Sequence, residues 1–227
     1  MNEKEIKTDR MMGPDSYIII NELLKNKIID DKIRILDLGC GKGLTSIYMA
    51  EKYKNADIFA VDLWVEAKDN YIFFKENNID NRIIPLNCDA EKLPFAESYF
   101  DIIVSVDAYH YFGLEKDFFK YNIKPLLKEN GEIYIAVPGL KDDYEKVPKE
   151  LKYHISEEDF KYFKSINYWE NLIKNDLKEI EVLEMKCFDE AWQSWLSCDN
   201  PYAAKDIELL KADNGKFLNL ISIKGKI

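Results

Sequence analysis

Apolar and polar residues follow two different periods along the first 140 residues of this chain. Short runs that are apolar at nearly every position predict buried strands, and they lie at 33–38, 56–61, 82–86, 100–106 and 132–137. Around these runs the apolar residues recur every three or four positions, which predicts helices at 14–26, 43–53, 65–78 and 114–128. Strands that alternate with helices indicate a parallel sheet covered on both faces.

The pattern changes after Gly139. Two further strands are expected, at 180–188 and 216–224. Segments of irregular, aromatic or helical character surround them, at 140–156, 157–175 and 189–212. Two terminal strands after five parallel ones predict an α/β fold: a Rossmann-like, doubly wound, seven-stranded sheet, mostly parallel with an antiparallel last strand.

We expect a single domain over residues 1–227, because this length supports one sizeable core. The sheet and its covering helices would form that core, at about 30–140 and 178–227. The remaining segments would form lid elements, at about 1–28, 140–175 and 189–212.

Charge and cysteine content narrow the classes of function. The net charge is −10, and acidic residues interrupt the lysine-rich stretches, so nucleic acid is not expected as a partner. The four cysteines form no CxxC pair, and no metal site is expected. We found no signal peptide and no apolar run long enough for a membrane span, and therefore expect a cytoplasmic protein that does not enter a membrane. The sequence does not indicate the oligomeric state.

The junction between the first strand and its helix carries the most informative motif. Residues 35–43 read Ile-Leu-Asp-Leu-Gly-Cys-Gly-Lys-Gly, so three of the nine glycines fall within five residues. Glycines crowded at such a junction indicate unusual backbone angles, or backbone that approaches a ligand closely. The free N–H groups of the following helix would face that ligand.

A second acidic residue suggests the kind of ligand. Asp62 ends the second strand, twenty-five residues after Asp37. A carboxylate at the tip of the neighbouring strand can accept two hydrogen bonds from a ribose diol, which favours an adenosine-containing cofactor. The glycine spacing differs from the GxGxxG of dinucleotide-binding folds. No Gly-Lys-Ser/Thr ends the loop, which excludes a P-loop.

Asp-Leu-Gly-Cys-Gly-Lys-Gly at 37–43 resembles motif I of the class I S-adenosylmethionine-dependent methyltransferases. The resemblance extends over about residues 30–140, and it implies S-adenosylmethionine as the cofactor. In that family the second-strand acid holds the ribose hydroxyls and an acid after the third strand holds the adenine amino group. The cofactor-binding residues implied here are Asp37, Gly39, Cys40, Gly41, Asp62, Leu63, Asp89 and Ala90.

The end of the fourth strand is the expected place for the second substrate, because ligands bind outside the carboxyl ends of such strands. The segment reads Asp107-Ala108-Tyr109-His110-Tyr111. His110 is a candidate general base and pocket residue, although it is also compatible with a purely structural role. Asp107 is a candidate for catalysis, for holding the cofactor's amino group or for holding the substrate. Tyr109 and Tyr111 are candidates for substrate contact.

Two aromatic residues outside the expected core are further candidates for the substrate pocket. Tyr17 would lie over the site, and Trp195 belongs to the Trp-rich lid segment. Aromatic residues in lid segments line a small-molecule pocket or form the lid's own core, and the sequence does not distinguish these two roles.

The resemblance implies transfer of a methyl group to a small-molecule acceptor by in-line displacement. Two alternatives stay open: an RNA or protein methyltransferase, and a non-catalytic module that binds S-adenosylmethionine. The sequence does not reveal whether carbon, nitrogen, oxygen or sulfur accepts the methyl group.

Overall fold

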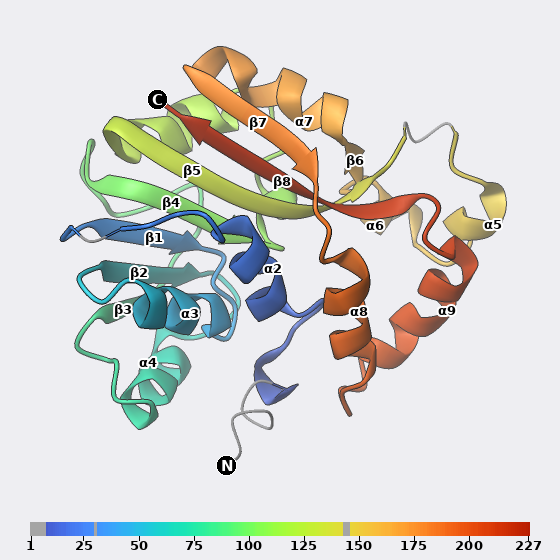
Figure 1. Ribbon diagram of the computed structural model, residues 1–227, viewed down its shortest axis with the longest axis horizontal. Coiled ribbons are helices and arrows are strands. Elements are labelled where there is room, and N and C mark those ends of the chain that lie inside the picture. The colour runs from blue at the N-terminus through green and yellow to red at the C-terminus, as the bar shows by residue number, and fades with distance from the viewer. Residues whose placement is uncertain (1–7, 30, 143–145) are drawn as a thin grey trace.

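The computed structural model describes residues 8–29, 31–142 and 146–227. Their centre is one mixed sheet with the strand order β3-β2-β1-β4-β5-β8-β7, and β6 pairs with the end of β5 (Figure 1). The strands are β1 (Arg34–Leu38), β2 (Asp57–Asp62), β3 (Ile83–Asn87), β4 (Phe100–Val106), β5 (Leu127–Leu140), β6 (Lys164–Ser165), β7 (Glu179–Glu184) and β8 (Leu218–Lys226).

The predicted fold class is confirmed. Strands β1 to β5 are parallel where they pair, and the last strand, β8, runs antiparallel to both β5 and β7. This antiparallel strand lies inside the sheet, between β5 and β7. Burial explains this order. The first six residues of β8 are buried, so β8 needs a neighbouring strand on each side. In β7, exposed glutamates alternate with apolar residues, so this strand is compatible with the edge of the sheet.

Helices cover both faces of the sheet. One face packs against α2 (Ser16–Leu23), α3 (Leu44–Lys52) and α4 (Ala67–Glu76). The other packs against α7 (Ile166–Ile173) and three short turns, η1 (Tyr109–Tyr111), η2 (Phe119–Ile123) and η3 (Lys124–Leu126). The apolar positions of the strands divide between these two cores, as a sheet buried on both faces requires.

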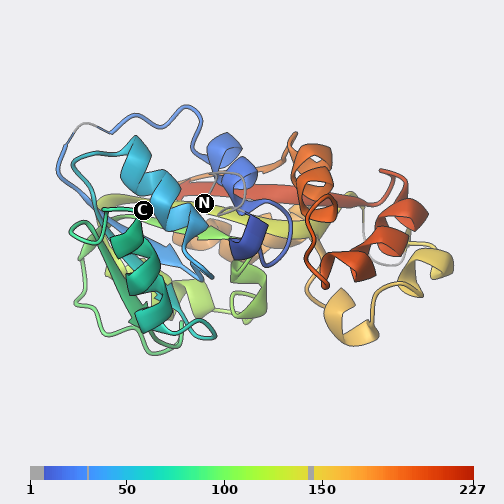
Figure 2. The ribbon, with the colours of Figure 1, turned by 90° about the horizontal axis from the view of Figure 1, so that it is seen from below.

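A separate group of helices lies beyond one end of the sheet, as Figures 1 and 2 both show. It contains α5 (Lys149–Lys152), α6 (Glu157–Phe160), α8 (Phe188–Leu196) and α9 (Ala203–Asp213). Two small cores hold the group together, and one of them reaches Met11 of the N-terminal segment. No helix in the described segments is long and apolar enough to cross a membrane.

Some predicted elements are wrong in detail. The helix expected at 114–128 is replaced by the irregular turns η2 and η3, because Pro125 lacks the N–H that an α-helix needs. Asn130 lies within β5 with a φ of 63°. The strand expected at 180–188 ends at Glu184.

Two expected segments are also interrupted. The segment 189–212 divides into α8 and α9, with Pro201 between them. The segment 157–175 divides into α6 and α7, with β6 between them.

Candidate functional site

The glycine-rich segment forms the turn between β1 and α3. Gly39, Gly41 and Gly43 have positive φ angles of 76°, 52° and 87°. A β-carbon at Gly39 would lie 2.2 Å from the β-carbon of Ala108, so only glycine lets the loop approach the end of β4. A β-carbon at Gly43 would meet Phe74 of α4, so this glycine serves helix packing.

Asp62 at the end of β2 fixes the glycine loop. Its carboxylate accepts the backbone N–H groups of Gly41, Trp64 and Val65 at 2.8, 2.8 and 2.9 Å. A carboxylate can accept about four hydrogen bonds, so these three fix its orientation and leave capacity for a ligand. Asp62 is 8% exposed, and it borders two adjoining cavities.

The first cavity has a volume of about 290 Å³ and lies at the carboxyl ends of β1, β2 and β3. Asp89 borders it, and one oxygen of its carboxylate accepts the N–H of Glu91 at 3.0 Å. No described residue donates to the other oxygen. Several residues predicted from the sequence come together on its walls: Gly39, Asp62, Leu63, Asp89, Ala90 and Tyr111.

The second cavity, of about 110 Å³, lies between the glycine loop and the N-terminal segment. Arg10 holds this segment on the loop, because its guanidinium donates to the carbonyl of Lys42 at 3.1 Å and covers the Phe73 ring at 3.7 Å. In the other direction, Nζ of Lys42 donates a hydrogen bond to the carbonyl of Asp9 at 3.2 Å. The two cavities share five lining residues, which makes them one continuous site: Gly39, Asp62, Trp64, Ala108 and Tyr111.

Asp37 and Cys40 contribute differently to this loop. Asp37 is fully buried beneath it, accepts the hydroxyls of Thr45 and Ser46, and borders neither cavity. Burial raises the pKa of Asp37 to about 6. Cys40 borders the smaller cavity, and burial raises the pKa of its thiol, which therefore stays protonated.

Asp107 follows β4 and borders the smaller cavity. Its backbone has a φ of 54°, and its N–H donates to the carbonyl of Ala136 at 2.8 Å. No described residue donates a hydrogen bond to its carboxylate. Burial, followed by the nearby charge of Asp206, raises the pKa of Asp107 to about 7.

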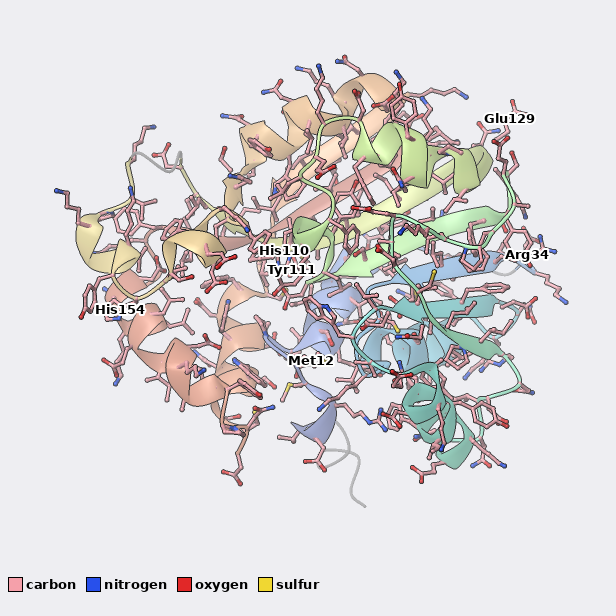
Figure 3. All side chains as sticks on the ribbon, turned by 180° about the vertical axis from the view of Figure 1, so that it is seen from behind. Met12, Arg34, His110, Tyr111, Glu129 and His154 are labelled. Atoms are coloured by element: carbon pink, nitrogen blue, oxygen red, sulfur yellow. The ribbon has the colours of Figure 1, made fainter. Side chains whose placement is uncertain are left out.

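His110 lies behind the cavity wall. Its ring packs 4.1 Å from the ring of Tyr111, and the two are adjacent in Figure 3. His110 is 3% exposed, its Nδ1 has no partner among the described residues, and it borders neither cavity. Burial lowers the pKa of His110 to about 3, so the imidazole is neutral.

Three other candidates lie away from both cavities. Tyr17 packs edge-on against Tyr48 and its hydroxyl donates to Glu51 at 3.2 Å. Tyr109 is buried in the second core of the sheet. Trp195 is buried in a small core with Trp192 and Ala203, and its Nε1 donates to Asp206 at 2.8 Å.

The sequence analysis did not single out several residues that shape the site. Asn70 of α4 is 1% exposed and donates to the carbonyl of Gly41 at 2.9 Å. Trp64 and Phe112 directly follow two predicted site residues, Leu63 and Tyr111. Lys42 lies within the glycine-rich motif but received no role, and Arg10 received none either, because their contact depends on how the N-terminal segment folds back.

Comparison with protein families identifies the class of this fold and site. A family model described as a methyltransferase domain matches residues 29–196, which is well over half of the chain. The chain therefore belongs to the methyltransferase domain family, as its resemblance to the class I enzymes indicated.

Individual relatives are more distant. The malonyl-[acyl-carrier protein] O-methyltransferase of Geobacter sulfurreducens is 28% identical over 108 residues, which are 43% of this chain and 38% of that protein. The match thus spans less than half of the relative's length.

Solved structures share the fold at low sequence identity. Phosphoethanolamine N-methyltransferase 2 of Haemonchus contortus, in complex with S-adenosyl-L-methionine, superposes with a TM-score of 0.76 at 20% identity, over 96% of this chain and 54% of that chain. Geranyl diphosphate C-methyltransferase of Streptomyces coelicolor A3(2) superposes with a TM-score of 0.69 at 12% identity, over 99% of this chain and 80% of that chain.

Proposed function

We propose that this protein is an enzyme that transfers a methyl group from S-adenosylmethionine to a small molecule. The observation that carries the proposal is the position of Asp62. Its carboxylate is oriented by three backbone N–H groups and stands where the two cavities meet. A fixed acceptor at that point suits a ribose diol.

The larger cavity fits the adenosine part of the cofactor. Leu63 offers an apolar surface for a flat base, and the unpartnered oxygen of Asp89 suits an exocyclic amino group. Ala90 borders the same space with its backbone. Gly39 and Ala108 also border this cavity, where the absence of a side chain at Gly39 lets the loop approach the end of β4.

The smaller cavity fits the methionine part. Arg10 and Lys42 border it on the glycine-loop side, and Asp107 borders it at the end of β4. The carboxylate of that tail matches the positive charges of Arg10 and Lys42. Cys40 and Gly41 of the glycine loop also border this cavity.

The residues of the site mainly align the reactants and exclude water. When bound, S-adenosylmethionine supplies an electrophilic methyl group on a sulfonium, and displacement of that group requires an in-line nucleophile. Tyr111 and Trp64, whose ring centroids are 5.1 Å apart, stand over both cavities and restrict access of water. Of the two candidate bases, geometry favours Asp107, because it borders the smaller cavity whereas His110 borders neither cavity.

The preference for a small acceptor rests on the size of the site and on charge. The cavities are narrow, and a chain with a net charge of −10 repels nucleic acid backbones. The named substrates of the structural relatives, phosphoethanolamine and geranyl diphosphate, are also small. The proposal extends to a single domain with lid helices and to a cytoplasmic location, which the four free cysteines favour.

Calorimetric titration with S-adenosylmethionine and S-adenosylhomocysteine tests the proposal. We expect both to bind the wild-type protein and Asp62→Ala to bind neither measurably. Binding without transfer to any component of a metabolite extract would favour a non-catalytic module. Tight, salt-sensitive binding of RNA would favour the RNA methyltransferase alternative.

A further inference from the structure

One carboxylate at the smaller cavity receives no hydrogen bond from the part of the chain that the structure describes. Asp107 accepts no hydrogen bond from any described residue, and its side chain is only partly exposed where it borders the cavity. The carboxylate of Asp206 on α9 is close enough to act on it electrostatically, and that charge is repulsive. A carboxylate so placed either takes up a proton or pairs with a cation that comes from outside the chain.

Several local features make room for this carboxylate. The left-handed backbone of Asp107 is unfavourable for a residue with a side chain, and such strain persists where surrounding structure imposes it. Gly13 provides the space, because Oδ2 of Asp107 lies 2.8 Å from the point where a β-carbon of residue 13 would be. The described residues thus hold the carboxylate at the cavity and donate no hydrogen bond to it.

The two cations that border the cavity are engaged elsewhere. Arg10 stacks on Phe73 and donates to the carbonyl of Lys42, and Lys42 donates to the carbonyl of Asp9. The acidic residues that act on Arg10 are Glu76, Asp69 and Asp9. Neither cation therefore neutralises Asp107.

Aromatic rings complete this part of the site. The rings of Tyr111 and Trp64 pack edge to face and are nevertheless 47% and 66% exposed. Tyr111 also packs against Tyr162 at 5.1 Å. In Figure 3, Tyr111 lies at the end of the sheet, with Met12 of the N-terminal segment below it. Exposed ring faces beside a carboxylate are the usual surroundings of a bound organic cation.

We propose that the methyl acceptor is an amine that is protonated in water, held by the carboxylate of Asp107 and the ring faces of Tyr111 and Trp64. This inference rests on the proposed function and adds the acceptor class. It excludes phenols, carboxylates and carbon acids as the preferred substrates.

The same arrangement accounts for the chemical step. The ammonium group loses one proton, and the carboxylate of Asp107 accepts it, which a pKa of about 7 permits at neutral pH. The freed nitrogen lone pair forms the new N–C bond. The C–S bond breaks at the same time, and its electron pair stays on sulfur, leaving a neutral thioether.

A different cation would bind the same carboxylate in the alternative arrangement, namely the ammonium group of the cofactor's own methionine tail. The two occupants make different demands on Asp107. If it serves the cofactor, Asp107→Asn weakens the binding of S-adenosylhomocysteine. If it serves the acceptor, the variant keeps cofactor affinity and loses its preference for cations.

Calorimetric titration of the full chain, saturated with S-adenosylhomocysteine, tests the inference. The probes are two matched pairs: choline with its neutral isostere 3,3-dimethylbutan-1-ol, and benzylamine with benzyl alcohol. We expect at least one cation of a pair to bind ten times or more tightly than its neutral partner. Asp107→Asn removes this preference, whereas Asp199→Asn, the same change at an exposed position, leaves it intact.

Tyr111 provides a second readout. Tyr111→Phe keeps the ring face and retains the preference for cations, whereas Tyr111→Leu reduces it at least threefold. The inference is overturned if the neutral isosteres bind as well as the cations, if no probe binds, or if Asp107→Asn affects only the cofactor. Failure of S-adenosylhomocysteine to bind the wild-type protein would instead overturn the proposed function.

Discussion

The carboxylate of Asp107 occupies the space that a side chain at position 13 would need. Its Oδ2 lies 2.8 Å from the point where a β-carbon of Gly13 would stand. The N-terminal segment and the end of β4 therefore fit together only because residue 13 is glycine. This contact closes the smaller cavity on the side of the N-terminal segment.

Gly13→Ala should displace the carboxylate of Asp107. We expect a loss of about 1–3 kcal/mol in the free energy of unfolding from overpacking, and a fall in methyl transfer of at least tenfold. Denaturant unfolding and a labelled-methyl assay measure the two effects. In a double-mutant cycle, Asp107→Ala should remove most of the cost in stability. Equal costs in both backgrounds would show that the two residues are not coupled.

Asp62→Ala should loosen the glycine loop and abolish cofactor binding. The change leaves the N–H groups of Gly41, Trp64 and Val65 without their acceptor, at a cost of about 2–3 kcal/mol in stability. We expect affinity for S-adenosylhomocysteine to fall at least a hundredfold in calorimetry. Asp57→Asn, at the opposite end of β2, is the control and should bind as the wild type does.

The motif around Asp37 and Asp62 made much of this site predictable from the sequence. Strand periodicity located the carboxyl ends of β1, β2 and β3, and residues at those ends had to share one edge of the sheet. That reasoning correctly brought Gly39, Asp62 and Asp89 to a common cavity. It succeeded because parallel strands fix the neighbours of their terminal residues.

The other walls of the site depend on tertiary folding that leaves no local pattern. Arg10 reaches the glycine loop because the N-terminal segment folds back over it. Tyr17 and Trp195 seemed equally suited to a pocket and to a lid core, and packing against Tyr48 and hydrogen bonding to Asp206 decided their places. Aromatic content alone does not distinguish a lining residue from a core residue.

Asp107 should make stability depend on pH. Its pKa is about 7 in the folded state and 3.8 in the unfolded state, so between these values the folded protein holds a proton that the unfolded chain has released. The stabilisation it contributes is therefore complete below about pH 4 and is lost as the pH rises through 7. One pKa unit corresponds to about 1.4 kcal/mol.

Asp107→Asn removes this dependence. Relative to the wild type, the variant should gain about 3 kcal/mol between pH 4.5 and pH 8, measured by denaturant unfolding. Asp37, whose pKa is about 6, also makes the free energy of unfolding fall as the pH rises. This contribution is the same in both proteins and cancels in the difference between them. A constant difference between variant and wild type would mean that Asp107 is ionised throughout this range. Asp199→Asn serves as the exposed control.

His110 and Asp107 should differ in their effect on turnover. His110→Phe keeps the ring that packs on Tyr111 and removes both nitrogens. We expect kcat to fall less than fivefold in this variant, and at least a hundredfold in Asp107→Asn, with cofactor affinity unchanged in both. With a pKa of about 3, His110 should not shape the pH–rate profile between pH 5 and pH 9. A larger loss in His110→Phe would make the histidine the base.

Transfer of an isotopically labelled methyl group tests the account most directly. The wild-type protein and Asp62→Ala are incubated with labelled S-adenosylmethionine and a metabolite extract, and the products are identified by mass spectrometry. We expect the wild-type protein to place the label on the nitrogen of a small amine and Asp62→Ala to place none. Label found on RNA or protein, or equal labelling by both proteins, would contradict the account.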